Sequence, residues 1–444
     1  KTIKLDPTNY NAHSNLGLVY KDLKKYNKSL YFYKKAVELE PNLTAAHYNI
    51  GLIFNVLREY SKAISSYKKA LETTGTLITN SLKRNMIEKN ITKDYLHDDI
   101  YNNLGVSYSL INEIQKSKEY YEKTIKIKPN HTIALNNLGI LHHHTGDFLK
   151  ALNCFHKIIE FDPNNTDLLN NLTDLFSNFK INFNQNNNKQ LFKKIFLFLF
   201  NNNNIYHKHI SRSVILFLLE TGNYKQIKNI FNSSSLLLNN KIIQEFLKDE
   251  LLHLILQKSL IESPFFEKLF MKLRLEMLTS LENSNKDFLT EYSDFIISLA
   301  EQCWLNEYIF TQSEEETNKI NDLKNKIENN NLVNELEIAM LACYIPLNNS
   351  KIISDNLLNY KSKNILFNDL LNVQIREPLK EIELSKSIRS LDKITDTVSI
   401  KVRDQYEEHP YPRWRYANKL IPKSFIEWIN AEVKPNIIEY NDNI

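Results

Sequence analysis

The sequence predicts an all-helical protein in which a solenoid of helical hairpins precedes a second all-helical domain. Glycines recur 34 residues apart, at Gly17 and Gly51 and again at Gly105 and Gly139, and this period is typical of stacked helix–turn–helix units. In the second half of the chain apolar residues recur at helical intervals, and no segment alternates as a half-buried strand does. We therefore expect a solenoid, a helical domain and an extended Pro/aromatic linker over residues 1–180, 186–400 and 401–444, respectively.

Each repeat carries the same types of side chain around its glycine. In the first repeat Leu16 precedes the glycine, Tyr33 and Ala36 follow in the second helix, and Pro41 ends the unit. Small residues let the paired helices approach, aromatic residues fill the space between them, and proline stops the second helix. Four units agree in this way, and a fifth has Thr173 in the glycine position. The pattern is that of the tetratricopeptide repeat.

Residues 75–97 interrupt this array. Gly51 and Gly105 are 54 residues apart, 20 more than one period, and the extra residues are polar and rich in asparagine and lysine. We expect a lengthened second helix followed by a surface loop.

One asparagine recurs in every repeat, two positions before the glycine or its threonine equivalent: Asn15, Asn49, Asn103, Asn137 and Asn171. First helices line the concave face of a solenoid, so these side chains are expected to form a ladder in the groove. An amide both donates and accepts hydrogen bonds, which suits the backbone of an extended peptide of any sequence. The ladder resembles that of the repeat domain of O-GlcNAc transferases. Alternatively, asparagine is simply frequent at this position and throughout the chain.

Charge and apolar content narrow the classes of partner. The formal net charge is +4, from 56 basic and 52 acidic residues, which gives no case for a nucleic-acid partner. The longest apolar runs, residues 195–200 and 214–219, are far shorter than the roughly 20 residues that span a bilayer. We expect a protein or peptide partner and no membrane partner, and we predict no oligomeric state.

The positions of the cysteine, histidine and glycine residues in the sequence do not indicate a catalytic or metal site. Three cysteines far apart provide neither a disulfide framework nor metal-ligand spacing, which favours the cytoplasm. The run His142–His144 lies on one helix, where neighbouring side chains diverge, and His142 is expected to pack in the core. No glycine follows Gly222, so residues 223–444 cannot form the glycine turn of a Rossmann-like cofactor site. We assign no catalytic residue, no metal and no cofactor to this chain.

The second domain is predicted helix by helix. Ser263 and Pro264 are typical of an N-cap followed by proline at the first helical position, and Gly222 is a candidate C-cap. Ser313 and Glu316 have the spacing of a capping box. Cys303 has no histidine near it in the sequence and is interpreted as a buried apolar residue. The expected helices are residues 205–220, 241–261, 264–282, 287–310, 334–344 and 377–389, with one more beginning after Ser313.

Within residues 405–414, QYEEHPYPRW, the segment from His409 to Trp414 is expected to form a stiff, extended strut. Each of its two prolines fixes its own φ and pushes the residue before it towards extended geometry. We expect the strut to dock on a neighbouring domain; the alternative is a packed tail. The docking residues would be Tyr406, Pro410, Tyr411, Pro412, Arg413 and Trp414.

Five segments, in this order, resemble one family: residues 300–310, 313–316, 341–347, 376–379 and 405–414. The chain is similar to bacterial tetratricopeptide-repeat proteins that carry a C-terminal class I methyltransferase domain dependent on S-adenosylmethionine. The resemblance implies that the chain is the substrate-recruiting and linker portion of such an enzyme, whose catalytic domain would bind the cofactor beyond Ile444. The chain departs from the family by ending there without a glycine loop, and by His409 where asparagine is common. We expect it to be a fragment at its N-terminus, and at its C-terminus either a fragment too or a natural variant that lost catalysis.

Two alternatives remain open. The first is a non-enzymatic adaptor that is complete near Ile444. The second is a glycosyltransferase fused to repeats, which shares the asparagine ladder but not the segments after residue 300.

Overall fold

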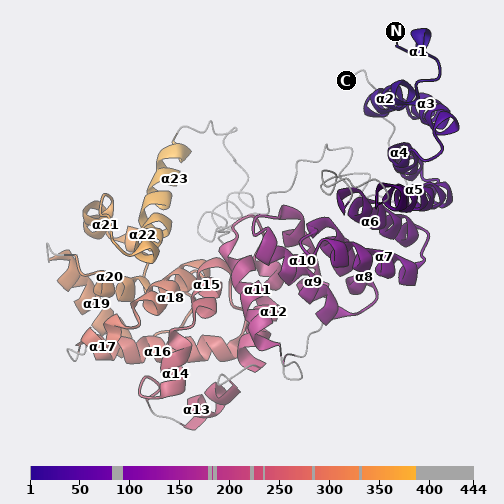
Figure 1. Cartoon of the computed structure of the whole chain (residues 1–444). Helices are drawn as coiled ribbons and strands as arrows, with labels where there is room; N and C mark the ends of the chain where they lie inside the picture. The colour runs from indigo at the N-terminus through magenta and orange to yellow at the C-terminus, as the bar shows by residue number, and fades with distance from the viewer. Residues whose placement is uncertain are drawn as a thin grey trace, which may run out of the picture. The chain divides into compact units, whose positions relative to one another are not determined.

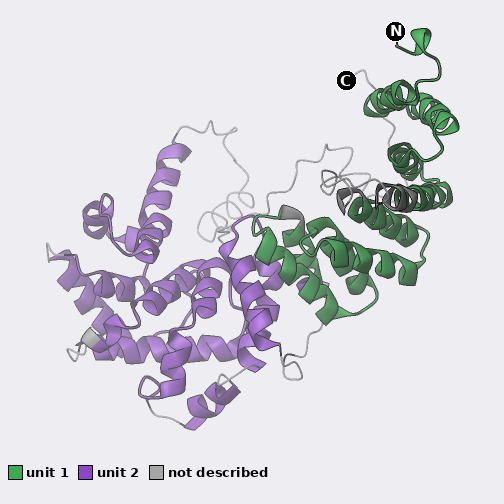
Figure 2. Cartoon of the chain, viewed as in Figure 1, with its two compact units in different colours: residues 1–175 green, residues 176–444 purple. Residues whose placement is uncertain are grey.

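The structure, a computed structural model, describes residues 2–82, 94–178, 183, 188–220, 225–233, 236–282, 286–329 and 333–386. Every regular element in these ranges is a helix, which confirms the predicted fold class (Figure 1). Within the same ranges, no helix has the length and apolar content needed to cross a bilayer. The chain divides into two compact units, unit 1 and unit 2, which comprise residues 1–175 and 176–444 (Figure 2).

Unit 1 is a stack of helical hairpins joined by short turns. The first helices of the five repeats are α2, α4, α6, α8 and α10, and the second helices of the first four are α3, α5, α7 and α9 (Figure 1). The bounds are α1 Thr2–Leu5, α2 Tyr10–Asp22, α3 Tyr26–Leu39, α4 Thr44–Val56, α5 Tyr60–Leu82, α6 Asp94–Leu110, α7 Ile114–Ile127, α8 Thr132–His144, α9 Phe148–Phe161 and α10 Thr166–Asn178.

The repeating glycines bring paired helices into close contact. A Cβ atom built on Gly51 would lie only 2.5 Å from the ring of Tyr67 in the second helix, so no larger residue fits there without a shift. The other three repeats pair a glycine with an aromatic ring in the same way, at Gly17 and Tyr33, Gly105 and Tyr121, and Gly139 and Phe155. The 34-residue period therefore reflects one helix–helix contact, a glycine against an aromatic ring, that recurs in each of the four repeats.

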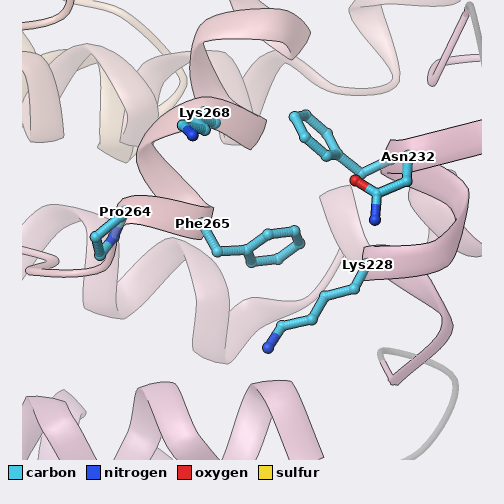
Figure 3. Close-up of a pocket in the computed structure, with 6 residues that line it drawn as sticks. Lys228, Asn232, Pro264, Phe265 and Lys268 are labelled. Atoms are coloured by element: carbon cyan, nitrogen blue, oxygen red, sulfur yellow. The ribbon is translucent and has the colours of Figure 1, made fainter.

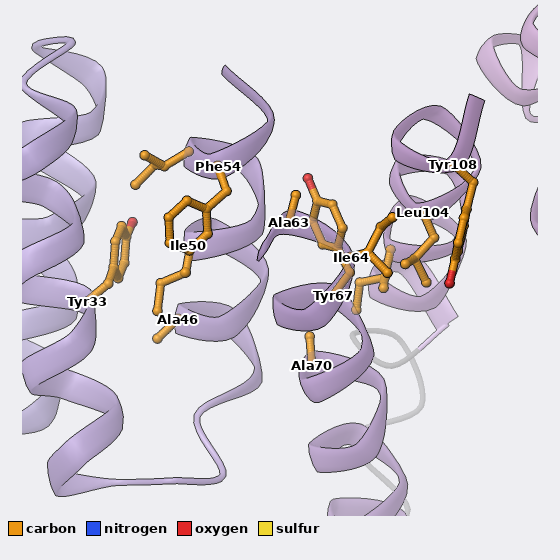
Figure 4. Close-up of a cluster of buried hydrophobic side chains, with 12 residues drawn as sticks. Tyr33, Ala46, Ile50, Phe54, Ala63, Ile64, Tyr67, Ala70, Leu104 and Tyr108 are labelled. Carbon is orange, nitrogen blue, oxygen red and sulfur yellow. The ribbon is translucent and has the colours of Figure 1, made fainter. Parts of the chain in front are cut away.

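A buried apolar cluster runs through the first three repeats without a break (Figure 4). It contains Tyr33 from α3, Ile50 from α4, Tyr67 from α5 and Leu104 from α6. The 20 extra residues therefore leave the stacking intact. They lengthen α5 to 23 residues, against 14 in α3, which confirms the predicted extension; the expected loop lies outside the described residues.

The turn inside each hairpin places one residue in the left-handed region of φ. These residues are Lys24 (φ 57°), Arg58 (61°), Asn112 (61°) and Gly146 (80°), at equivalent positions in the four repeats. Asparagine and glycine tolerate this conformation well, whereas lysine and arginine are strained in it. The first two hairpins thus carry strain that the next two avoid.

Unit 2 is organised around α18 (Ser293–Leu305), in which every residue from Phe295 to Leu305 is buried. This helix contacts α15, α20 and α22. The other bounds are α11 Lys189–Asn201, α12 Lys208–Glu220, α13 Ile227–Ser233, α14 Lys241–Leu247, α15 Glu250–Lys258, α16 Pro264–Glu282, α17 Lys286–Thr290, α19 Glu314–Glu328, α20 Glu335–Ala342, α21 Lys351–Leu357, α22 Ile365–Leu371 and α23 Glu377–Ser385. A short 3₁₀-helix, η3 (Leu347–Asn349), and a short π-helix, η4 (Asn372–Arg376), complete the unit.

In unit 2 two of the predicted helix caps are observed, whereas two of the predicted helices are each divided into two shorter ones. Helix α16 begins at Pro264, and the capping box of Ser313 and Glu316 opens α19, as expected. The helix expected over residues 241–261 is instead two, because the side chain of Asp249 accepts a hydrogen bond from Leu251 N (2.9 Å) and starts α15. The helix expected over 287–310 is likewise split, into α17 and α18. Gly222 lies outside the described residues.

Candidate functional site

The five predicted asparagines lie at equivalent positions on the first helices α2, α4, α6, α8 and α10. We call the surface that these residues share the first-helix face. Asn15 is exposed, whereas Asn49, Asn103, Asn137 and Asn171 are half-buried. The predicted register is therefore present in the fold.

Three of the asparagines connect consecutive repeats through their side-chain amides. Asn103 Nδ2 donates to Tyr48 Oη (3.0 Å), and Asn137 Nδ2 donates to Asn102 Oδ1 (3.3 Å). In the next repeat Nδ2 of Asn171 donates to Oδ1 of Asn136 at 2.7 Å. Each acceptor stands immediately before the ladder asparagine of the preceding repeat. Our sequence interpretation, in which both ends of each amide were open to a peptide, missed this bond; the polar residue before each asparagine was the available signal.

The carbonyl ends of the same three amides are open. Within the described residues no donor bonds Oδ1 of Asn103, Asn137 or Asn171. Because the Nδ2 bonds fix the orientation of each amide, the three oxygens are held as a row of hydrogen-bond acceptors. One acceptor is contributed by each of repeats three, four and five.

Asn49 and Asn15 differ from these three residues. Asn49 Oδ1 accepts from Lys21 Nζ at 2.8 Å, and its Nδ2 donates to the carbonyl oxygen of Ala45 at 2.8 Å. Both ends of this amide are therefore engaged. Asn15 forms no side-chain hydrogen bond with the described residues.

Exposed aliphatic side chains flank the amides on the first helices. Ile133 lies four residues before Asn137 and is 61% exposed, and Leu110 lies seven residues after Asn103 and is 54% exposed. Residues four or seven apart share one face of a helix. Leu18 and Val56 are exposed at related positions in the first two repeats. The first-helix face thus combines hydrogen-bond acceptors with apolar contact area.

The histidine run of α8 diverges, as expected. His142 is buried, with Nδ1 3.3 Å from Asp147 Oδ2, and burial lowers its pKa. His143 and His144 stack on each other with ring centroids 5.7 Å apart. The prediction that His142 packs in the core is confirmed. The part of the chain that the structure describes has no group of three or more histidine, cysteine or acidic residues placed to hold a metal.

The three cysteines are buried free thiols. Burial raises the pKa of Cys154 to about 11 and that of Cys303 to about 12. A thiol of such high pKa carries almost no thiolate at neutral pH and is a poor nucleophile. The interpretation of Cys303 as a buried apolar residue is confirmed.

Three of the segments that resemble the methyltransferase family, residues 300–310, 313–316 and 341–347, meet in the core of unit 2 around Arg274, which is 2% exposed. Its guanidinium donates to the carbonyl oxygens of Cys343 and Thr311, both at 3.1 Å, and lies 3.9 Å from the ring centroid of Tyr344. Tyr344 Oη in turn donates to Glu316 Oε1 at 3.0 Å. These contacts hold the three segments together in the core of unit 2. Arg274 was missed in the sequence, where its helical spacing from the apolar residues Phe270 and Leu278 was the available signal.

The buried amide of Gln374 joins two of the same segments, residues 300–310 and 341–347. Gln374 Nε2 donates to the carbonyl oxygen of Ala300 (3.2 Å), and its Oε1 accepts from Leu347 N (3.2 Å). The docking residues expected in the strut, Tyr406, Pro410, Tyr411, Pro412, Arg413 and Trp414, lie outside the described residues.

Unit 2 also has a cavity of about 320 Å³ between α13 and α16 (Figure 3). Phe231 and Phe265 form one wall, with ring centroids 5.8 Å apart, and Lys228 Nζ lies 5.5 Å from the centroid of Phe265. Its polar lining consists of exposed side chains. We assign no ligand to it.

Known proteins resemble this chain in its repeats. Residues 10–43 and 132–165 match one family model described as tetratricopeptide repeat, and residues 44–74 and 98–131 match another of the same description. No curated protein matches the sequence.

Three solved structures are similar at low identity. YrrB, described as a TPR protein with an unusual peptide-binding site, is 19% identical with a TM-score of 0.34; the match covers 49% of this chain and 94% of that one. MamA is 27% identical with a TM-score of 0.30, over 36% of this chain and 82% of that one. PilW, described as a widely conserved type IV pilus biogenesis factor, is 16% identical with a TM-score of 0.32, over 55% and 86%.

Proposed function

Because residues 10–74 and 98–165 form four tetratricopeptide repeats, we propose that this chain is a protein-binding scaffold that holds an extended polypeptide segment on its first-helix face. Repeat arrays of this kind use their long surfaces for binding. The observation that carries the proposal is the row of fixed acceptors at Asn103, Asn137 and Asn171 beside exposed aliphatic side chains.

The surface suits an extended segment better than a folded domain. Its acceptors recur once per repeat along a line, which matches the regular recurrence of backbone N–H groups in an extended chain. Apolar area from Leu110 and Ile133 adds affinity that does not depend on a particular side-chain sequence.

The test uses a 12-residue peptide selected from a display library against the whole chain, with affinity measured by calorimetry. We expect Leu110→Glu and Ile133→Glu each to weaken binding at least about tenfold, because each places a charge in an apolar contact. Both side chains are more than half exposed, so the fold should tolerate the changes. Leu39→Glu is the matched control, since Leu39 is 40% exposed on the second helix α3. Unchanged binding by Leu110→Glu and Ile133→Glu would show that the peptide binds elsewhere.

We propose further that the scaffold recruits the substrate of a methyltransferase dependent on S-adenosylmethionine. The support is the resemblance of residues 300–310, 313–316, 341–347 and 376–379 to that family. This chain does not fit the cofactor itself, because class I sites need a glycine turn and no glycine follows Gly222. A catalytic domain beyond Ile444 would bind it. The adaptor alternative shares the same groove and lacks the transfer step.

A labelling experiment with the protein translated from the whole gene distinguishes the methyltransferase proposal from the adaptor alternative. Methyl-labelled S-adenosylmethionine should label a protein captured by the repeats, and Leu110→Glu should abolish the labelling. Capture without labelling would favour the adaptor. The buried free thiols support the proposal that the protein acts in the reducing cytoplasm.

A further inference from the structure

The two kinds of helix in unit 1 differ in charge. The second helices α3, α5, α7 and α9 contain twelve lysines and five glutamates. The first helices α2, α4, α6, α8 and α10 contain one lysine, Lys21, and no arginine or glutamate; apart from histidines, their other ionisable side chains of the usual acidic and basic kinds are aspartates and tyrosines. The near balance of charge over the whole chain therefore hides a segregation between first and second helices.

Two exposed aspartates lie beside the ladder asparagines. Asp99 stands four residues before Asn103 on α6, and Asp174 stands three residues after Asn171 on α10. Residues three or four apart share one face of a helix, so both carboxylates belong to the first-helix face. The side chain of Asp99 is 55% exposed, and Asp174 is exposed as well.

Neither carboxylate is neutralised by a fixed positive charge. Among the described residues, no lysine or arginine nitrogen lies within 4.0 Å of Asp99 or Asp174, and Asp99 Oδ1 lies 3.8 Å from His131 Nε2. Burial, with a smaller effect of Asp99, raises the pKa of Tyr48 on α4 to about 12. Burial lowers the pKa of His143 on α8, and the charge of Asp174 opposes this shift. Each negative charge thus acts on the first helix of the preceding repeat.

We infer that the polypeptide segment held on the first-helix face is basic, with lysine or arginine side chains that reach Asp99 and Asp174 and apolar side chains that contact Leu110 and Ile133. This inference rests on the proposed function and specifies its partner. A carboxylate accepts charge-assisted hydrogen bonds from an ammonium or guanidinium group. The lysines of the second helices repel the same segment, so the segregation of charge directs it to the first-helix face.

A pair of substitutions at Leu110 reports the sign of the partner's charge. Leu110→Glu and Leu110→Lys remove the same apolar contact and add opposite charges. With the library-selected peptide, we expect Leu110→Lys to weaken binding about two- to fivefold more than Leu110→Glu does, the range of one exposed ion pair. Equal losses, or a larger loss in Leu110→Glu, would overturn the basic segment and leave the scaffold proposal intact. No loss in either variant would refute the proposed function and this inference with it.

Substitution of the aspartates tests the same inference without changing side-chain size. We expect Asp99→Asn and Asp174→Asn each to weaken binding about two- to fivefold, and the double variant to lose less affinity than the wild type when salt is added. Glu122→Gln is the matched control, because it removes an exposed acid from the second helix α7; its affinity should change less than about twofold. Unchanged affinity in both aspartate variants would overturn the inference, as would selected peptides with no excess of lysine and arginine over the starting library.

Discussion

Asn171 donates its side-chain amide to Oδ1 of Asn136 in the preceding repeat, at 2.7 Å. One bond thus joins two repeats and also orients the carbonyl oxygen that, in the proposed function, faces a partner. A change at Asn136 should therefore alter both stability and binding, although Asn136 itself need not contact the partner.

We expect Asn136→Ala to lower the free energy of unfolding by about 0.5–1.5 kcal/mol, the usual contribution of one hydrogen bond. It should also weaken peptide binding, because the amide of Asn171 is then free to rotate. Urea denaturation and calorimetry measure the two effects. Asn170→Ala is the control, since Asn170 is exposed on the same helix and its side chain forms no hydrogen bond with the described residues. Equal effects of both substitutions would contradict a role for the inter-repeat bond.

Arg58→Gly should stabilise the protein. Arg58 is exposed and has a φ of 61°, a conformation that costs a non-glycine residue roughly 1–2 kcal/mol. Glycine removes this strain but makes the unfolded chain more flexible, so we expect a net gain of at most about 1 kcal/mol. Gly146→Ala, at the equivalent turn with φ 80°, should change stability in the opposite direction. A loss of stability in Arg58→Gly, measured by thermal unfolding, would show that the arginine side chain contributes more than its backbone costs.

His207 should make the stability of unit 2 depend on pH. The side chain is 1% exposed, and burial, with a smaller effect of Lys258, lowers the pKa of His207 to about 4. The unfolded state, with a pKa near 6.5, takes up the proton first as the pH falls. The stability that the neutral imidazole contributes is therefore fully present above pH 6.5. It is lost as the pH falls from 6.5 to 4, and over this range the free energy of unfolding decreases by about 3 kcal/mol.

The measurement is the free energy of unfolding at several pH values. His207→Gln should flatten the profile between pH 6.5 and 4, since glutamine does not titrate there. His144→Gln is the control, because His144 is exposed. A wild-type profile that is already flat in this range would contradict the prediction.

Arg274→Met should destabilise unit 2 by about 3–5 kcal/mol. The guanidinium, 3.8 Å from Glu316 Oε1, is that carboxylate's nearest positive charge among the described residues, and Glu316 is only 6% exposed. Removing one member of a buried pair leaves the other charge uncompensated. Urea denaturation should show part of the loss restored in the double variant Arg274→Met, Glu316→Gln. An unchanged urea midpoint in Arg274→Met would refute a structural role for this group.

Local rules were enough to predict the repeats and several caps. The contact between Gly51 and Tyr67 requires a fixed spacing along the chain, so the sequence displays it directly. The same holds for the capping box of Ser313 and Glu316. Where two short helices share one apolar face the periodicity continues across the break, which is why the helix start at Asp249 was missed.

The register of the asparagines was predictable, and the use of their amides was not. The register depends on helical spacing within one repeat, whereas the bond from Asn137 to Asn102 depends on the distance between two repeats, which no local pattern encodes. The environment of Arg274 was hidden for the same reason, since its partners Thr311 and Cys343 lie 37 and 69 residues away in sequence.

The pattern of hydrogen bonds between repeats would be preserved if one repeat were duplicated. Asn103, Asn137 and Asn171 each donate to the residue that precedes the ladder asparagine one repeat earlier. An inserted copy of residues 132–165 would therefore find a donor on one side and an acceptor on the other. The length of the first-helix face therefore increases in proportion to the number of repeats. Each added unit would add one amide to the first-helix face and leave the existing contacts unchanged.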